Sequence, residues 1–502
     1  MSTQQFERIG TKTPARAKFD LRHELKTTGD MGYIYPIFKK ICMPGSVWNI
    51  GVNAIIRMQP LVAPVLHRID VKIEYFFVPL RLITFQEGEL DEKAWTDFIT
   101  GGDDGDDTTT LDTWTPTGAY SDAGSLWDYF GFPITATPGT PFVPTGTIPL
   151  AFPLYAYNKI WNEWYRAEHI QTERTYNDMS LALRNWEKDY FTAALPWQEL
   201  GDAVAIDLVA SAEWVQSSGA GSQYVFYYDD GDSRPDTAGT VATLNNNTVS
   251  SAVDVHDLRL AYQIQKWKEL NARAGVRYTE YLQAYFDVHP EDSRLQRSEY
   301  LGGTQMPLVI SEVLNQSAIT EFDSDDVITP QGDMSGHGIT GGNDFICKYR
   351  AEEWGIILGL LSIIPEPLYQ QGIPRELLYE SRYDWPNPLF VGLSEQEIYQ
   401  AEIFATHNNQ SENETIFGYI GRYDEHRVMH SLVTGGMRSD FDHWHISRQF
   451  AAAPTLNDSF LQCSPRKDIF AVPSEDGFII SIGNDITAIQ PIPAMNVPGN
   501  MT

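Results

Sequence analysis

Two histidines at alternate positions are the residues of this sequence best suited to metal chemistry. His443 and His445 flank Trp444 and follow Asp442. Alternate residues of a β-strand point to the same side, so a strand here would place both imidazoles on one face. A metal site needs a third and a fourth ligand. Two hydrogen-bonded histidines in a loop or an edge strand are therefore the favoured interpretation, and a metal site is the alternative.

A run of acidic residues between glycines could hold Ca²⁺ through carboxylate oxygens. The run spans residues 101–107, and it lacks the spacing and the terminal glutamate of an EF-hand loop. A solvent-exposed acidic turn is the favoured interpretation, so no metal or cofactor is assigned. The four weak candidate ligands are Asp103, Asp104, Asp106 and Asp107.

One glycine pattern matches the dinucleotide fingerprint G-x-G-x-x-G, at Gly336, Gly338 and Gly341. That fingerprint requires a strand before it and a helix after it, whereas both flanks here are predicted to be polar loop. The sequence also contains no phosphate-binding P-loop, no H-E-x-x-H and no G-x-S-x-G nucleophile motif. No catalytic residue is assigned, and we expect a protein that is not an enzyme.

The first 40 residues form a mildly basic segment in an acidic protein. They carry a net charge of +4, while the whole chain of 502 residues carries −31. This total excludes only a nucleic-acid binder recognised by overall basicity. A local hypothesis remains, in which basic side chains contact phosphates and Phe6 and Phe19 stack on bases. The nucleic-acid candidates are Lys12, Arg16, Lys18 and Arg22.

Three stretches hold most of the negative charge. Residues 86–128 carry a net charge of −11, and residues 201–256 and 311–344 carry −7 each. All three are rich in Gly, Thr, Ser, Asn and Pro, which are residues of turns and loops. We interpret them as long surface insertions between better-patterned segments.

Strand patterns occur early and late in the chain. Ile69–Val78 alternates apolar and charged residues before it ends at a proline, and Val47–Ile56 is a second candidate. Residues 345–364 predict two strands that meet near Glu352. Residues 478–482 and 486–492 predict a strand pair around the Gly483-Asn484 dipeptide.

Helical patterns lie between the strands. The candidates are Tyr155–Glu168, Leu181–Ala194 and Asp257–Ala274. Strands and helices do not alternate regularly, as a parallel α/β fold requires. The distribution instead favours an antiparallel β-sandwich with large connections.

No segment of the sequence predicts export or a membrane span. The first ten residues lack the apolar core of a signal peptide. The longest apolar run, Ile356–Ile364, is much shorter than the roughly 18 residues of a transmembrane helix. The sparse cysteines, without a C-x-x-C pair, indicate a reducing compartment. They are Cys42, Cys347 and Cys463.

Several uncommon strings, in a fixed order, resemble the major capsid proteins of microviruses, especially of the gokushovirus branch. The resemblance begins with the aromatic string at 155–166 (YAYNKIWNEWYR) and the string at 188–197 (KDYFTAALPW), and its most specific strings are those at 277–280 (RYTE) and 294–303 (RLQRSEYLGG). Shorter matches extend over most of the chain, at residues 31–36, 61–65, 76–82, 329–332, 369–375, 417–423 and 444–445. These viruses are small tailless phages with circular single-stranded DNA.

The resemblance implies a mainly β fold: an eight-stranded antiparallel jelly roll with long, partly helical insertion loops. Residues 1–40 would be a basic N-terminal arm on the inside of the shell. Residues 41–502 would be one jelly-roll domain. Its insertions would lie at about 86–150, 155–198 (helical), 201–256 (the candidate three-fold protrusion), 257–300 (helical) and 311–344.

The resemblance also implies a function and partners. The protein would assemble with itself into a T=1 icosahedral shell that encloses single-stranded DNA, in a virion assembled in the bacterial cytoplasm and without a membrane. Further implied partners are a small basic DNA-binding protein, a pilot protein, an internal scaffolding protein and a host cell-surface receptor that external loops contact. The alternatives are a glycan-binding jelly roll and a cupin-like metal enzyme that uses His443 and His445.

Overall fold

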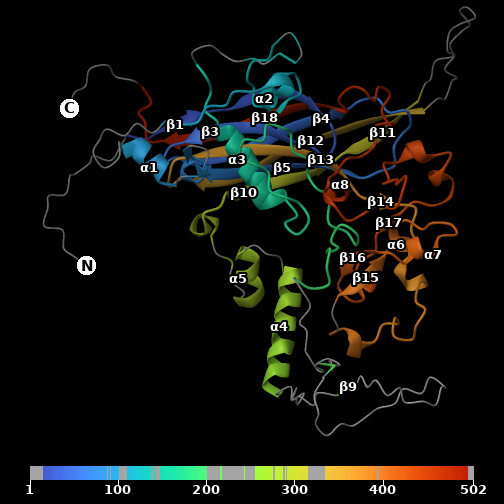
Figure 1. Ribbon diagram of the computed structural model, residues 1–502. Helices are drawn as coiled ribbons and strands as arrows, with labels where there is room; N and C mark the ends of the chain where they lie inside the picture. The colour runs from blue at the N-terminus through green and yellow to red at the C-terminus, as the bar shows by residue number, and fades with distance from the viewer. Residues whose placement is uncertain are drawn as a thin grey trace, which may run out of the picture.

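The chain folds mainly into antiparallel β-sheets, as a computed structural model shows (Figure 1). The structure describes residues 15–86, 89–90, 92–100, 110–135, 137, 139–140, 142, 147–200, 215–216, 242–243, 255–274, 278–286, 289, 291–314, 334–392 and 395–495. Lys12, the four aspartates of the acidic run and most of the 201–256 insertion lie outside these residues.

Six strands form the larger sheet. Its order is β1-β18-β4-β12-β11, and β2 also pairs with β18 beyond the short β1. Every pair in it is antiparallel. The strands are β1 (Ala17–Asp20), β2 (His23–Gly29), β4 (Val47–Met58), β11 (Val309–Leu314), β12 (Met334–Arg350) and β18 (Phe478–Gln490).

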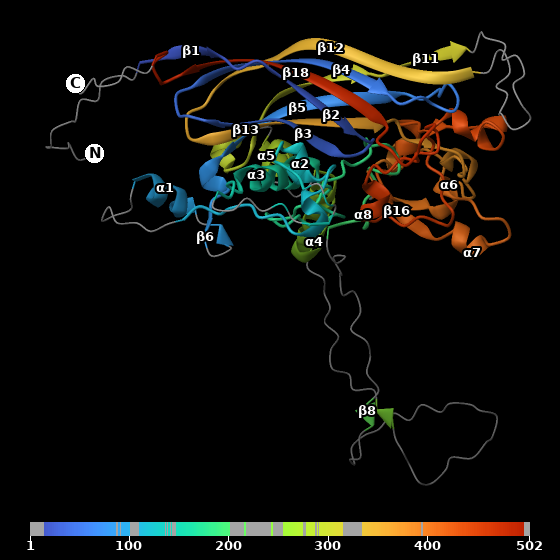
Figure 2. The ribbon, with the colours of Figure 1, turned by 90° about the horizontal axis from the view of Figure 1, so that it is seen from above.

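Four strands form the smaller sheet, in the order β10-β5-β13-β3. All three pairs are antiparallel. The strands are β3 (Ile34–Cys42), β5 (Ile69–Pro79), β10 (Glu299–Pro307) and β13 (Gly355–Pro365). In Figure 2 the smaller sheet lies between the larger sheet and helices α2 and α3.

The main core lies between the two sheets and follows from strand alternation. In β4, the buried Val52, Ala54 and Ile56 point into the core, and the intervening Asn53 and Ile55 are exposed. Buried and exposed residues alternate in such a strand because successive side chains point to opposite sides, one facing the core and one facing solvent. The side of the six-stranded sheet that faces away from the core is called the outer sheet face below.

A third layer covers the smaller sheet. Helix α3 (Phe152–Ile160) continues for one turn of π-helix, Trp161–Tyr165, and packs on β5 and β13. All eleven residues of β13 are therefore buried: Ile357 and Leu361 face the main core, while Ile356 and Leu358 face α3. This double burial explains the continuous apolar run in the sequence.

The C-terminal lobe, residues 366–470 with residues 189–198, has a smaller core of its own. Figure 2 shows it beside one end of the sandwich. Its elements are short: β14 (Leu368–Tyr369), β15 (Gln396–Tyr399), β16 (Ile416–Ile420), β17 (Ser431–Leu432), α6 (Gln400–Ile403), α7 (Gln410–Asn413) and α8 (Asp458–Leu461).

The remaining elements lie in the insertions. They are β6 (Phe85–Gln86), β7 (Glu89–Leu90), α1 (Glu92–Thr100), α2 (Leu126–Tyr129), β8 (Val215–Gln216), β9 (Ala242–Thr243), α4 (Val255–Ala274) and α5 (Tyr278–Phe286). The helices predicted at 155–168 and 257–274 are thus present with shifted ends.

The strand pair predicted around Gly483-Asn484 is wrong, because β18 runs unbroken through this dipeptide. Asn484 is buried and points into the core, where Tyr75 Oη donates to its Oδ1 at 3.0 Å. Its Nδ2 donates to the Ile37 carbonyl at 3.2 Å. The asparagine is therefore a satisfied core residue and not a turn residue.

Two further predictions of local structure are corrected. The helix predicted at Leu181–Ala194 is absent, and this segment is irregular with isolated bridges such as Tyr33 to Leu183. The stretch 311–344, predicted as a loop insertion, contributes strand residues at both ends, in β11 and from Met334 in β12. Gly336 and Gly338 allow close packing: a Cβ at Gly338 would lie 3.0 Å from Met58 Cβ.

The basic N-terminal segment contributes strands to both sheets from Ala17 onwards. Strands β1 and β2 pair with β18, and β3 pairs with β13. The domain boundary expected at residue 40 falls inside β3.

Candidate functional site

Three of the four predicted nucleic-acid residues lie within the described chain, at the edge of the six-stranded sheet. Arg16 precedes β1, Lys18 lies in β1, and Arg22 lies between β1 and β2. All three side chains are exposed. The structure therefore brings them to one end of one sheet.

Their electrostatic surroundings differ. Arg22 forms a bidentate pair with Asp20, with Nε to Oδ1 at 2.9 Å and Nη2 to Oδ2 at 2.6 Å. This hydrogen bonding lowers the pKa of Asp20 to about 2. Arg22 is thus already engaged by a carboxylate, whereas no described carboxylate lies within ion-pair distance of Arg16 or Lys18.

The two histidines do not share a strand face. Asp442–Trp444 forms a short 3₁₀ helix, and His445 follows it in extended conformation. His445 is buried, with Nε2 2.7 Å from the Met437 carbonyl oxygen and Nδ1 3.1 Å from the Ser447 backbone nitrogen. Both ring nitrogens are therefore used in hydrogen bonds, which confirms the favoured interpretation for His445.

The described residues contain no group of three or more His, Cys, Asp or Glu side chains arranged to hold a metal ion. The cysteines among them are free thiols. Within the same residues, no helix is both long and apolar enough to cross a membrane.

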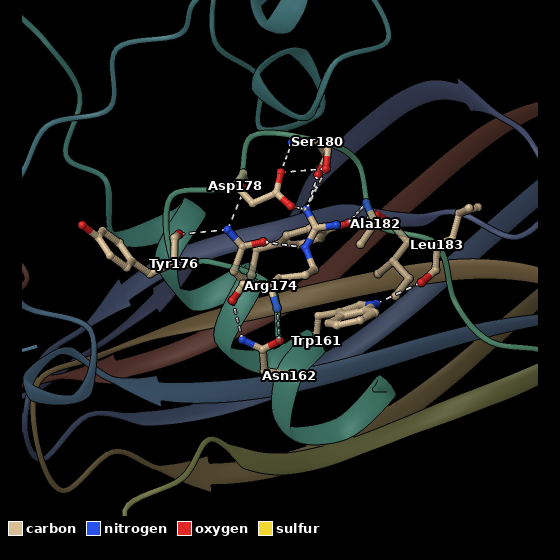
Figure 3. A network of polar contacts seen from close by, with 11 residues as sticks. Trp161, Asn162, Arg174, Tyr176, Asp178, Ser180, Ala182 and Leu183 are labelled. Atoms are coloured by element: carbon tan, nitrogen blue, oxygen red, sulfur yellow. Dashed lines mark hydrogen bonds and ion pairs between the residues drawn. The ribbon is translucent and has the colours of Figure 1, made fainter. Parts of the chain in front are cut away.

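Polar side chains of α3 hold the chain that follows the helix (Figure 3). Asn158 is buried, and its Nδ2 donates to the carbonyls of Tyr176 and Asp178, both at 2.9 Å. Its Oδ1 accepts from Arg174 Nε at 3.0 Å. Arg174 also lies 3.1 Å from the Asp178 carboxylate. These bonds satisfy backbone carbonyls from the side, so the segment stays ordered without being helix or strand.

Two aromatic residues of the same string tie this segment to the sheet. Tyr157 Oη donates to the Ile34 carbonyl at 2.8 Å and accepts from the Ala182 amide at 3.0 Å. Trp161 Nε1 donates to the Leu183 carbonyl at 2.9 Å (Figure 3). The aromatic string at 155–166 thus has a structural role, because it covers one face of the smaller sheet.

A partly buried ion pair completes the attachment. Arg184 Nη1 lies 2.5 Å from Glu74 Oε2 in β5 and 2.9 Å from Ser362 Oγ in β13. Tyr165 Oη donates to the same carboxylate oxygen at 2.8 Å. In the string at 188–197, Asp189 accepts from the Thr192 amide at 2.7 Å and from Tyr369 Oη at 2.6 Å. The strings at 155–166 and 188–197 thus contain residues that connect separate segments of the fold through hydrogen bonds.

The C-terminal lobe carries a cluster of exposed apolar side chains. Trp385 is 61% exposed, Leu389 85% and Met429 86%. We call this cluster the lobe surface; its members are Leu377, Tyr383, Trp385, Leu389, Val391, Val428 and Met429. Exposed apolar patches mark contacts with other proteins, so the lobe surface is a candidate for such a contact.

These observations define a structural protein that works through its surfaces. The residues of its characteristic sequence strings form hydrogen bonds that hold the fold together. Its exposed apolar side chains are candidates for contact with another protein.

Comparison with known proteins identifies the family. The profile of the family described as "Capsid protein (F protein)" matches residues 7–500. The chain is 30% identical to capsid protein VP1 of Chlamydia phage 1, with 99% of this chain and 97% of the relative aligned. It is also 30% identical to capsid protein VP1 of Bdellovibrio phage phiMH2K (98% and 97%) and 26% to that of Spiroplasma virus 4 (89% and 87%).

The chain therefore belongs to the capsid protein (F protein) family, and the resemblance to microvirus capsid proteins is confirmed. It is a structural component of a bacteriophage virion and not an enzyme, so the cupin-like alternative is not retained. The sequence analysis did not predict the lobe surface. The density of aromatic residues in 379–390 is the sequence feature that could have indicated it.

Proposed function

We propose that the chain is the repeating subunit of a T=1 icosahedral shell around circular single-stranded DNA, and that its sandwich is an eight-stranded jelly roll. The observation that carries the fold is strand order. Four strands of the larger sheet lie in the order β2-β18-β4-β12. The strands of the smaller sheet lie in the order β3-β13-β5-β10.

Successive strands of this set alternate between the sheets, except β5 and β10, which pair within the smaller sheet. The chain passes from β2 to β3, to β4 and to β5 by changing sheet each time, and it changes sheet again from β10 to β12, to β13 and to β18. Two interlocked Greek keys with this alternation make a double-sheet jelly roll, an architecture found in viral capsid domains. On this view β1 and β11 are additions to the eight strands.

The lobe surface supports assembly with further copies. Its Trp385 and Tyr383, with the neighbouring Arg382 and Arg422, are of the residue types that dominate binding energy at interfaces. The ring of Trp385 lies 5.5 Å from that of Tyr379, and the ring of Tyr383 lies 6.2 Å from that of Phe390, so each aromatic member has an aromatic neighbour. We assign this surface to contact between neighbouring subunits.

The proposal places the basic N-terminal residues Lys12, Arg16, Lys18 and Arg22 toward the packaged DNA. The acidic insertions then lie on the outside, with 201–256 as the three-fold protrusion and external loops in contact with a host receptor. A small basic DNA-binding protein, a pilot protein and an internal scaffolding protein complete the virion, which forms in the bacterial cytoplasm without a membrane. The support is the charge asymmetry along the chain and the family.

Electron microscopy of negatively stained protein tests the proposal. The chain is expressed alone and together with the neighbouring phage genes, and the particles are imaged from both preparations. We expect uniform small spherical shells in at least the co-expressed sample. Monodisperse monomers in both samples would contradict the assignment.

A further inference from the structure

The outer sheet face gathers positive charge from segments far apart in the sequence. The register pairs Arg350 of β12 with Val47, Val47 with Ile489, and Ile489 with Lys18 of β1. These four residues form one row across four strands. At a strand spacing of 4.7–4.9 Å, Arg350 and Lys18 lie about 14 Å apart.

The next row adds a third cation. Lys348 pairs with Asn49, which pairs with Thr487, and the row ends at Asp20. Trp48 and Ile50 point into the core on either side of Asn49, so Lys348 and Arg350 project from the outer sheet face. Arg16 lies at the same end, because its Nη2 would be 3.2 Å from a Cβ at Gly45, in the turn before β4.

None of these four cations forms an ion pair with a carboxylate in the part of the chain that the structure describes. No described carboxylate lies within ion-pair distance of Arg16, Lys18, Lys348 or Arg350, and each of these side chains is exposed. Two exposed carboxylates share these rows, Asp20 and Asp485, and Arg22 lies within ion-pair distance of both. In a chain with a net charge of −31, the four unpaired cations therefore leave this end of the face with an excess of positive charge.

An exposed aromatic ring lies beside the cations. Phe345 is 69% exposed and pairs with Gly51, two residues along β4 from Asn49. Two residues of a strand span about 7 Å, so the ring lies next to the Lys348 row. In Figure 2 no described element covers β12, β4 and β18 on this side.

We infer that Lys348, Arg350 and Phe345 complete, with Arg16 and Lys18, a binding site for single-stranded nucleic acid on the outer sheet face. The inference rests on the proposed function and extends it, because neither β12 residue belongs to the N-terminal segment. Cations spaced across the strands neutralise phosphates, and the ring offers a stacking platform for a base. This combination is how proteins hold single strands without reading their sequence.

The test measures the binding of a labelled oligothymidylate of about 20 nucleotides, longer than the ~4–16 nucleotides that one small domain covers. Fluorescence anisotropy is recorded over a range of salt concentrations with the full chain. The variant is Lys348→Gln/Arg350→Gln. Its matched control is Lys266→Gln/Arg294→Gln, which removes the same charge from exposed positions outside both the outer sheet face and the lobe surface.

We expect the slope of log affinity against log salt to become shallower by about 1.4 in the variant, at ~0.7 for each lost phosphate contact, and to stay unchanged in the control. Phe345→Ala is expected to weaken binding about tenfold, whereas Ile55→Ala on the same face should have no such effect. Equal slopes for variant, control and wild type would overturn the inference.

Two further results separate the alternatives. Competition by polyglutamate as strong as by unlabelled oligothymidylate, together with an inert Phe345→Ala, would show a general polyanion surface and overturn the assignment to nucleic acid. Shell formation is scored in parallel by electron microscopy. Shells that form normally while all slopes are equal contradict this inference alone, and wild-type chains that form no shells contradict the proposed function.

Discussion

Tyr75 of β5 and Asn484 of β18 join the two sheets through the middle of the core, with 3.0 Å between Tyr75 Oη and Asn484 Oδ1. Both side chains are almost fully buried. This hydrogen bond pairs the Tyr75 hydroxyl with Asn484 Oδ1, and the Asn484 Nδ2 donates to the Ile37 carbonyl, so the apolar layer tolerates both side chains. It also fixes how β18 lies against β5, since a slip of one residue would turn Asn484 outward.

Tyr75→Phe is expected to lower the free energy of unfolding by about 1–3 kcal/mol, because Asn484 Oδ1 loses its donor while it stays buried. Urea unfolding followed by circular dichroism measures the effect. Tyr300→Phe, in the neighbouring strand β10 and partly exposed, is the matched control and should change stability by less than about 0.5 kcal/mol. Equal effects of the two substitutions would contradict the role given to the bridge.

Gly372→Ala is expected to destabilise the C-terminal lobe by about 3 kcal/mol or more. A Cβ at this position would overlap the carbonyl oxygen of Glu402. Backbone hydrogen bonds hold the two segments together, from the Ile373 amide to the Ala401 carbonyl at 3.0 Å and from the Ala405 amide to the Gln371 carbonyl at 2.9 Å, so the clash cannot relax easily.

Thermal unfolding and limited proteolysis of the lobe measure the effect of Gly372→Ala. Gly392→Ala is the control, because among the described residues no heavy atom outside Gly392 and its two chain neighbours lies within 4 Å of a Cβ built there. A Gly372→Ala chain as stable as the control would show that the lobe adapts to the extra methyl group.

His67 is expected to make the fold less stable as the pH falls from about 6.5 to about 4. Burial lowers the pKa of His67 from its usual 6.5 to about 4. The geometry suits a neutral ring, with Nε2 2.8 Å from the Glu366 carbonyl oxygen and Nδ1 3.3 Å from the Ile446 amide nitrogen. Over this range the unfolded chain binds a proton that the folded chain does not, so stability decreases with falling pH by at most about 3 kcal/mol.

Urea unfolding of the wild type and of His67→Gln at several pH values checks this expectation. Glutamine keeps a donor for the Glu366 carbonyl but does not titrate, so the stability gap between the two proteins should narrow toward pH 4. The exposed His407→Gln should keep the pH dependence of the wild type. A gap that stays constant would mean that His67 does not titrate differently on folding.

Trp385→Asp/Leu389→Asp is expected to abolish shell assembly while it leaves the folded subunit intact. Both side chains are exposed, so their loss should change the stability of the subunit by no more than about 0.5 kcal/mol. Burying two carboxylates in an apolar interface, in contrast, costs several kcal/mol. Sedimentation and electron microscopy measure assembly.

The control for the lobe surface is Asn387→Asp. The Asn387 side chain accepts a hydrogen bond from the Leu389 amide, and aspartate can accept the same bond while it adds charge to the same loop. We expect shells from this variant. Shells from the Trp385 and Leu389 double variant as well would remove the lobe surface from the subunit contacts.

Local patterns predicted the parts of the fold that local chemistry determines. The alternation of Ile69–Val78 and Val47–Ile56 predicted β5 and β4, since one face of each strand meets the core. The Gly483-Asn484 dipeptide misled because turn chemistry and core hydrogen bonding use the same residue type, and only Tyr75, about 400 positions earlier, decides between them.

The candidate site was predicted in part for a similar reason. Arg16, Lys18 and Arg22 stood out because they cluster in sequence, yet Asp20 engages Arg22. Lys348 and Arg350 did not stand out, because they follow an acidic stretch. Their position near Lys18 follows from the register between β12, β4, β18 and β1, and local sequence does not determine this register.

The position of β18 has a consequence for the timing of folding. Strands β1 and β2 are synthesised long before their sheet partner β18, which is the last of the described strands in chain order. Until it arrives, β4 has an open edge and the early strands have no ladder to join, so closure over such a long stretch of chain is slow. A chain that stops before β18 therefore lacks the finished sandwich, and we expect only chains that contain β18 to assemble.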